Sequence, residues 1–156
     1  MSLQKELGLP NPITHPGHET VMSLVLTGEI LAKEGDRLLR AFSLTDSQFN
    51  ILMLLKYQVE GGEINQTQLG RMLLVNRSNV TGLIDRMEKA GWVERSSEAG
   101  DRRVKRIKLT AVGRRLVERA EKVYFAEIEK IMAALTPDEA RRLCAFTERL
   151  RERLHG

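Results

Sequence analysis

The chain has 156 residues, of which 42% are hydrophobic and 29% are charged, and its formal net charge is +4. This length allows one domain with a hydrophobic core and is too short for an additional catalytic module. No apolar run approaches the roughly 18 residues that cross a bilayer, and no signal-peptide pattern opens the chain. The single cysteine, Cys144, fits a reducing compartment. We therefore expect a cytoplasmic protein with no membrane partner.

Residues 1–18 contain three of the four prolines and two of the three histidines. Proline restricts the backbone and removes an N–H donor, so we expect an extended arm without regular structure. His15, His18 and Glu19 could be read as metal ligands. However, such an arm supplies no further anchor of known geometry, so we expect neither a metal site nor a cofactor.

Helical patterns fill the next part of the chain. Between Val21 and Phe42 the apolar residues form two rows, which requires more than one neighbour. A short apolar helix is predicted from Asp46 to Val59, ended by Gly61 and Gly62. Asn65 followed by Gln68 resembles a capping box and predicts a further helix from Gln66 to about Leu74.

The segment after this helix combines one more helix with a hairpin. Val80, Leu83, Ile84 and Met87 form one apolar stripe, and Gly91 suits the left-handed turn after a helix. Trp92 and Val93 then begin a strand, residues 97–101 have turn chemistry, and Arg103–Leu109 is predicted as the return strand.

Two long helices are predicted to close the chain. Thr110 can cap a helix that keeps its apolar spacing to about Leu135, and Thr136 and Glu139 give a second start signal. The last helix carries the apolar residues Leu143, Phe146, Leu150 and Leu154. Burial against a second copy best explains these stripes, the alternative being a helical hairpin that packs on its own domain. Cys144 is expected to pack in the interior rather than to sense oxidants.

Positive charge is concentrated in one part of the chain. Residues 71–117 contain twelve basic and five acidic side chains, whereas residues 1–70 contain five and eight, and residues 118–156 contain eight of each. The excess lies on the predicted helix and hairpin, as expected when phosphates are the partner. Together these features predict a mainly α fold with a small β-hairpin wing: a winged helix-turn-helix that binds double-stranded DNA.

The sequence predicts three regions in the chain. Residues 1–18 form the arm, residues 19–45 and 111–156 a helical dimerisation region, and residues 46–110 the DNA-binding domain. Within this domain we expect major-groove contacts from Arg77, Ser78, Asn79 and Thr81, and phosphate contacts from Gln66, Thr67 and Arg71. An ordinary solvated helix face is the alternative for the first group.

The sequence resembles the MarR family of transcriptional regulators over roughly Leu44–Leu150. The resemblance rests on five segments in order: LTDSQFNIL (44–52), QTQLGRMLLV (66–75), SNVTGLIDRMEKAGWVER (78–95), DRRVKRIKLT (101–110) and LTPDEA (135–140). It implies a homodimer that binds a pseudopalindromic operator, commonly as a repressor, and is released by a small molecule or by oxidation. Small aromatic or phenolic effectors would bind near the 21–57 region.

The resemblance also implies roles for single residues. Asp101 and Arg103 match an Asp-x-Arg wing motif in which the acid braces the wing and the arginine enters the minor groove. Arg86 matches a position near the DNA backbone, although an ion pair with Asp85, Glu88 or Asp101 is equally compatible with its place on the helix. Arg102, Lys105 and Arg106 are expected to add unspecific phosphate attraction.

Other classes of function are less well supported. The motifs of a P-loop, a dinucleotide-binding fold, a nucleophile elbow or a zinc hydrolase are absent, so the sequence does not predict an enzyme. A DNA-binding protein without an effector would have the same sequence features. A protein-interaction module that has lost DNA binding is disfavoured by the wing arginine and by the basic excess.

Overall fold

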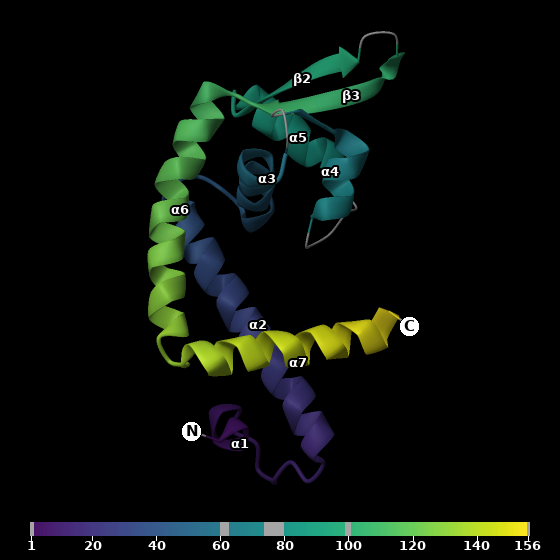
Figure 1. Ribbon diagram of the computed structural model, residues 1–156. Helices are drawn as coiled ribbons and strands as arrows, with labels where there is room; N and C mark the ends of the chain where they lie inside the picture. The colour runs from purple at the N-terminus through teal and green to yellow at the C-terminus, as the bar shows by residue number, and fades with distance from the viewer. Residues whose placement is uncertain (1, 60–62, 74–79, 99–100, 156) are drawn as a thin grey trace. The chain divides into compact units, whose positions relative to one another are not determined.

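The computed structural model describes residues 2–59, 63–73, 80–98 and 101–155, apart from the side chains of residues 97, 98 and 101–104. The chain divides into two compact units, Met1–Val117 and Glu118–Gly156. The predicted fold class, mainly α with a small β-hairpin, is confirmed (Figure 1). The elements in order are α1 (Leu3–Glu6), α2 (Pro16–Arg40), α3 (Asp46–Tyr57), β1 (Glu63–Asn65), α4 (Gln66–Met72), α5 (Val80–Lys89), β2 (Val93–Glu98), β3 (Asp101–Leu109), α6 (Ala111–Met132) and α7 (Pro137–His155).

The N-terminal region contains more helix than the sequence predicts. The expected arm over residues 1–18 is wrong in part, because Leu3–Glu6 form a helical turn and α2 begins at Pro16, five residues before Val21. Proline suits this position because its fixed φ matches the first helical turn and no N–H partner is needed there. The ring of His15 caps the helix, and its Nδ1 atom accepts a hydrogen bond from the His18 backbone N–H at 3.2 Å.

The core of the first unit is built around α3. Thr45 and Gln48 form a capping box at the start of this helix, with the Gln48 N–H donating to Thr45 Oγ1 at 3.3 Å and the Thr45 N–H donating to Gln48 Oε1 at 3.0 Å. This arrangement satisfies two backbone donors that have no partner within the helix. The helix then buries side chains that pack with those of the following helices and strands. The almost completely buried side chains of the unit are Leu39, Phe49, Ile51, Leu52, Leu55, Leu69, Ile84, Met87, Val93, Ile107 and Val117.

The three strands form an antiparallel sheet in the order β1-β3-β2. In the register, Ile107 of β3 lies between Ile64 of β1 and Arg95 of β2. The two predicted hairpin strands are present, but they extend into the predicted turn of residues 97–101, because β2 ends at Glu98 and β3 begins at Asp101. Strand β1 was not predicted. It has only three residues, too few for an alternating pattern to be recognised.

The turn from α5 into β2 has a defined geometry. The Gly91 N–H donates to the Glu88 carbonyl at 2.9 Å, and the Trp92 N–H donates to the Met87 carbonyl at 2.9 Å. These two bonds make a Schellman motif, which places the residue after the helix in the left-handed region. Gly91 has φ +73°, as the sequence predicted.

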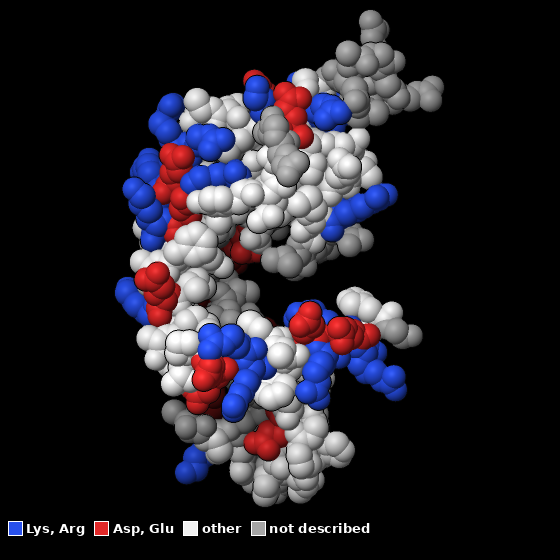
Figure 2. All heavy atoms as spheres, viewed as in Figure 1, with Lys and Arg blue, Asp and Glu red and all other residues white. Residues whose placement is uncertain are grey.

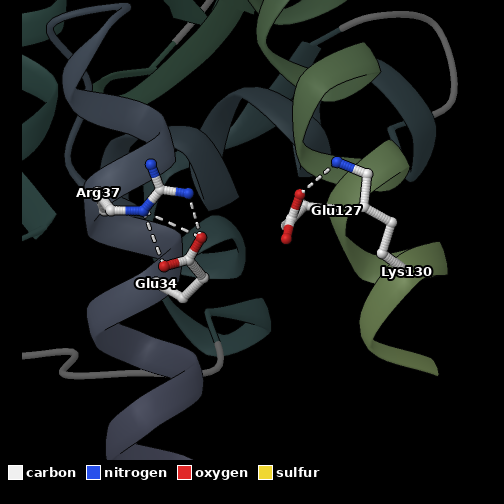
Figure 3. A network of polar contacts seen from close by, with 4 residues as sticks. All are labelled: Glu34, Arg37, Glu127 and Lys130. Carbon is white, nitrogen blue, oxygen red and sulfur yellow. Dashed lines mark hydrogen bonds and ion pairs between the residues drawn. The ribbon is translucent and has the colours of Figure 1, made fainter. Parts of the chain in front are cut away.

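Both predicted caps of the last two helices are confirmed. Thr110 Oγ1 accepts from the Gly113 N–H at 3.0 Å at the start of α6, and Thr136 Oγ1 accepts from the Glu139 N–H at 3.3 Å at the start of α7. Exposed ion pairs one turn apart lie along the helices, as Figure 3 shows for Arg37 with Glu34 on α2 and for Lys130 with Glu127 on α6, each within its own helix. Exposed pairs of this kind contribute little to stability.

The second unit leaves much of its apolar surface uncovered. Phe146, Leu150 and Leu154 of α7 are 53%, 46% and 82% exposed, and no residue of this helix is buried. The expectation that Cys144 packs in the interior is wrong for the single chain, because this thiol is exposed. Within the described ranges, none of the helices combines the length and the hydropathy of a membrane-spanning segment.

Candidate nucleic-acid interface

Helices α4 and α5 form the helix-turn-helix of the first unit, with residues 74–79 between them outside the described part. Leu69 of α4 and Ile84 and Met87 of α5 are buried in the common core. Val80 of α5 lies beside α4, where a Cβ added to Gly70 would make an ordinary contact of 3.5 Å with Val80 Cγ2. Burial of one face of each helix fixes which side chains remain available to a partner.

Two residues predicted to contact DNA contact each other. Gln66 lies at the first position of α4 and Thr81 at the second position of α5, and Gln66 Nε2 donates to Thr81 Oγ1 at 2.9 Å. This bond ties the exposed edges of the two helices together. Asn65, the residue before α4, caps the helix, and its side chain accepts from the Thr67 N–H at 2.7 Å. The predicted cap is therefore present, but the bond is to Thr67 and not to Gln68 as in a capping box.

The other predicted contact residues fall into two groups. Thr67, Arg71, Arg86 and Lys105 are exposed. Arg77, Ser78 and Asn79 lie outside the described residues. The backbone of residues 101–103 belongs to β3, but the side chains of Asp101, Arg102 and Arg103 are not described, so the predicted roles of these six residues stay predictions.

The acidic residues of α5 have a partner that the sequence analysis did not identify. The sequence alone makes Asp85 and Glu88 possible partners of Arg86. In the structure, Arg95 of β2 forms ion pairs with both, at 2.5 Å from Asp85 Oδ1 and 2.8 Å from Glu88 Oε2. No local sequence pattern indicates this contact. It forms because the turn at Gly91 folds β2 back along α5.

Basic side chains occur on several elements of the first unit. Figure 2 shows Lys and Arg side chains around the start of α6, with Asp and Glu side chains among them, and further Lys and Arg side chains near α4. Lys105 and Lys108 of β3 are exposed, and Lys108 lies 3.7 Å from Glu94 of β2. The charges of residues 71–117 are therefore carried by the helix-turn-helix, the hairpin and the start of α6.

A helix-turn-helix followed by a hairpin with excess positive charge defines a winged helix-turn-helix, a class of DNA-binding domain. The model of the MarR family matches residues 44–105. The regulator FarR of Neisseria gonorrhoeae is 31% identical over 106 residues, which are 67% of this chain and 70% of FarR. The chain belongs to the MarR family of transcriptional regulators.

Further curated relatives have similar coverage. The regulator PecS of Dickeya dadantii is 29% identical over 119 residues, 76% of this chain and 72% of PecS. The transcriptional repressor MprA of Escherichia coli is 28% identical over 124 residues, 80% of this chain and 70% of MprA. Both relatives are named as regulators of transcription.

Solved structures share the fold. The MepR–DNA complex of S. aureus has a TM-score of 0.75 at 22% identity and covers 85% of this chain and 96% of MepR. The organohalide-sensing regulator RdhR, bound to 2,4-dichlorophenol, has a TM-score of 0.80 at 21% identity and covers 93% of this chain and 87% of RdhR.

Proposed function

We propose that this protein is a homodimeric repressor that binds a pseudopalindromic DNA operator and is released by a small aromatic or phenolic effector. The observation that carries the DNA-binding part is the concentration of positive charge on the helix-turn-helix and hairpin, on a chain that belongs to a family of transcriptional regulators. In this proposal α5 enters the major groove and the hairpin lies along the adjacent minor groove. Repression is the direction of regulation recorded for the relative MprA.

The uncovered apolar faces of the terminal helices support a homodimer. On α2, Val21, Val25 and Ile30 are 58%, 57% and 49% exposed, and only Gly35 and Leu39 of its 25 residues are buried. On α7 the stripe of Leu143, Phe146, Leu150 and Leu154 is exposed throughout. Patches of this kind mark interaction sites, and a twofold dimer covers the same patch on both subunits.

A hollow between α3 and α4 supports an effector. It has a volume of about 210 Å³ and is lined by Asn50, Met53, Leu54, Tyr57, Gln58 and Met72. Apolar side chains with a few polar groups are the usual lining of a site for a small organic molecule. RdhR, which shares the fold, was solved with a chlorinated phenol. We therefore assign this hollow to a small aromatic or phenolic compound.

Recovery of bound DNA from a random pool, repeated with candidate phenols, tests the proposal. We expect an inverted repeat to be enriched and a phenol to release it from the wild-type protein. Met53→Trp fills the hollow and should abolish the release while leaving DNA affinity unchanged. Enrichment without release by any compound would instead support the second candidate function, a DNA-binding regulator without an effector. No enrichment would contradict sequence-specific binding.

A further inference from the structure

Arg95 of β2 makes an unusually complete set of contacts with one helix. Its Nη1 atom lies 2.5 Å from Asp85 Oδ1 and 2.8 Å from Glu88 Oε2, and its Nη2 atom donates to the Thr81 carbonyl at 3.4 Å. The Arg95 backbone N–H also donates to Glu88 Oε1 at 3.2 Å. Main chain and side chain of one strand residue are thus bound to α5.

The three partners of Arg95 are spaced along one side of the helix. Residues 81, 85 and 88 follow one another by four and three positions, which places them on one face over nearly two turns, about 10 Å of helix axis. A guanidinium group, with its planar fork of donors, suits such a row better than an ammonium group does. The row begins at Thr81, whose hydroxyl is bound by Gln66 of α4.

Burial of the arginine distinguishes this contact from the ion pair between Lys108 and Glu94. The Arg95 side chain is only 18% exposed, although its partners Asp85 and Glu88 are 49% and 40% exposed. Lys108 and Glu94, which lie 3.7 Å apart, are 49% and 59% exposed. A largely buried guanidinium with several hydrogen bonds holds its geometry better than a pair that is exposed on both sides, which water and salt weaken. The Arg95 contact can therefore set the position of α5 relative to the hairpin.

The contact also determines where the negative charge of α5 lies. Asp85 and Glu88 are two of the five acidic residues within residues 71–117. An uncompensated carboxylate on a helix in the major groove would repel the phosphates on either side. Arg95 draws both carboxylates towards β2 and neutralises part of their charge.

We propose that Arg95 is a specificity-determining positioning residue, which fixes the helix α5 against the hairpin so that both meet one DNA site in register. Arg95 acts through Asp85 and Glu88 rather than by contacting a base. The inference rests on the proposed function, in which α5 and the hairpin bind one operator. It predicts that loss of Arg95 changes the preference between DNA sequences more than it changes the attraction to DNA in general.

The matched pair of variants is Arg95→Gln and Lys108→Gln. Each removes one positive charge from the same hairpin, but only the first removes a contact with α5. The readout is the ratio of Kd values for the selected operator and for an operator altered at one base pair of each half-site. We expect Arg95→Gln to lower this ratio about tenfold, which is within the range of coupling measured for contacting residues. Lys108→Gln should leave the ratio unchanged.

Two further variants test whether Arg95 acts through the carboxylates. Arg95→Lys keeps the positive charge but loses the planar guanidinium group, so the ratio of Kd values should be only partly restored. This variant replaces Arg95→Gln if Arg95→Gln does not fold. In a protein that already carries Asp85→Asn and Glu88→Gln, adding Arg95→Gln should lower the ratio of Kd values only slightly, because the partners of Arg95 are already lost. The proposal is overturned if Arg95→Gln weakens binding equally on every sequence, or if its effect on the ratio is the same in both backgrounds.

Hydrogen exchange of α5 amides in the free protein gives a readout that does not depend on DNA. We expect faster exchange in Arg95→Gln than in Lys108→Gln, because only Arg95 is bound to the helix. Equal exchange in the two variants would overturn the positioning role even if operator binding were never found. Absence of sequence preference in the wild-type protein, by contrast, would overturn the proposed function and leave the exchange result to decide the role of Arg95.

Discussion

The carbonyl oxygen of Trp92 occupies the space that a side chain at residue 113 would need. A Cβ added to Gly113 would lie 2.0 Å from this oxygen and 2.9 Å from Leu109 Cδ1. The same carbonyl accepts from the Thr110 N–H at 3.1 Å and from the Thr110 hydroxyl at 3.0 Å. The start of α6 is thereby held against Trp92, the residue before β2.

Gly113→Ala should therefore destabilise the protein. The new methyl group overlaps backbone rather than a movable side chain, so we expect a loss of about 1–3 kcal/mol or more in the free energy of unfolding. Gly70→Ala is the matched control, because it also lies in a helix but its Cβ would meet Val80 at 3.5 Å, an ordinary contact. That change should stabilise the helix by roughly 0.5–1 kcal/mol. Denaturant unfolding of both variants measures the difference, and equal stability would refute the close approach.

Asp46 predicts a particular pH dependence of stability. Burial, followed by the neighbouring charge of Asp36, raises the pKa of the Asp46 carboxyl above 3.8, against the effect of a hydrogen bond from Asn50. The folded state therefore favours the protonated carboxyl. The contribution of this group is most favourable below pH 3.8 and is lost as the pH rises through the raised pKa.

Asp46→Asn should accordingly be more stable than the wild-type protein at pH 7, and the gain should disappear below about pH 3.8.

Glu139 gives the opposite case: hydrogen bonds from the Thr136 backbone N–H and hydroxyl lower the pKa of its carboxyl below 4.5. Its stabilising effect is present above pH 4.5 and is lost as the pH falls through the lowered pKa. Unfolding of Asp46→Asn and Glu139→Gln between pH 3 and 7 measures both trends. A pH-independent difference for Asp46→Asn would be inconsistent with this account.

How far the sequence predicts this fold depends on the length of each signal. Helices with long apolar stripes and polar caps, such as those started by Thr110 and Thr136, were predicted close to their observed bounds, because periodicity and capping are local properties. The three-residue strand at Ile64 was missed because its existence depends on pairing with Ile107, more than forty positions away. The start of α2 at Pro16 does not follow from the proline content, because proline breaks a helix in its interior but suits its first turn.

The candidate site was predicted in outline rather than in its contacts. The charge distribution and the stripe of α5 located the helix-turn-helix, since both are visible in one segment of sequence. The bond between Gln66 and Thr81, and the ion pairs of Arg95, depend on how two elements pack. No local sequence pattern determines which partner a side chain takes. From the sequence, Arg86 is as good a partner for Asp85 as any, whereas in the structure Asp85 forms an ion pair with Arg95.

The dimer proposal makes a prediction about α7. Leu150→Glu places a charge within the exposed apolar stripe, so we expect the protein to become monomeric and its operator affinity to collapse, because two linked half-sites no longer bind together. Ala145→Glu introduces the same residue on the opposite side of the helix and should remain dimeric. Light scattering and a gel shift compare the two. A Leu150→Glu variant that stays dimeric with full affinity would assign the stripe to another role.

Base recognition can be separated from phosphate attraction by three variants. Arg77→Ala and Asn79→Ala should each cost roughly 1–3 kcal/mol on the operator and relax the preference for particular bases. Arg103→Ala should weaken binding most at sites with a narrow, A·T-rich minor groove, where arginine is attracted by shape and potential. Competition binding with operators altered one position at a time tests all three. Equal losses of Arg77→Ala and Asn79→Ala on every sequence would mean that these residues contact only the backbone.

The most direct test of DNA binding is the salt dependence of affinity for the selected operator. Residues 71–117 carry a net charge of +7 per subunit. If each subunit of a dimer neutralises roughly three to five phosphates, the logarithm of the binding constant should fall against the logarithm of salt concentration with a slope of about −5 to −9. A slope near zero would contradict a DNA-binding surface on the helix-turn-helix and hairpin.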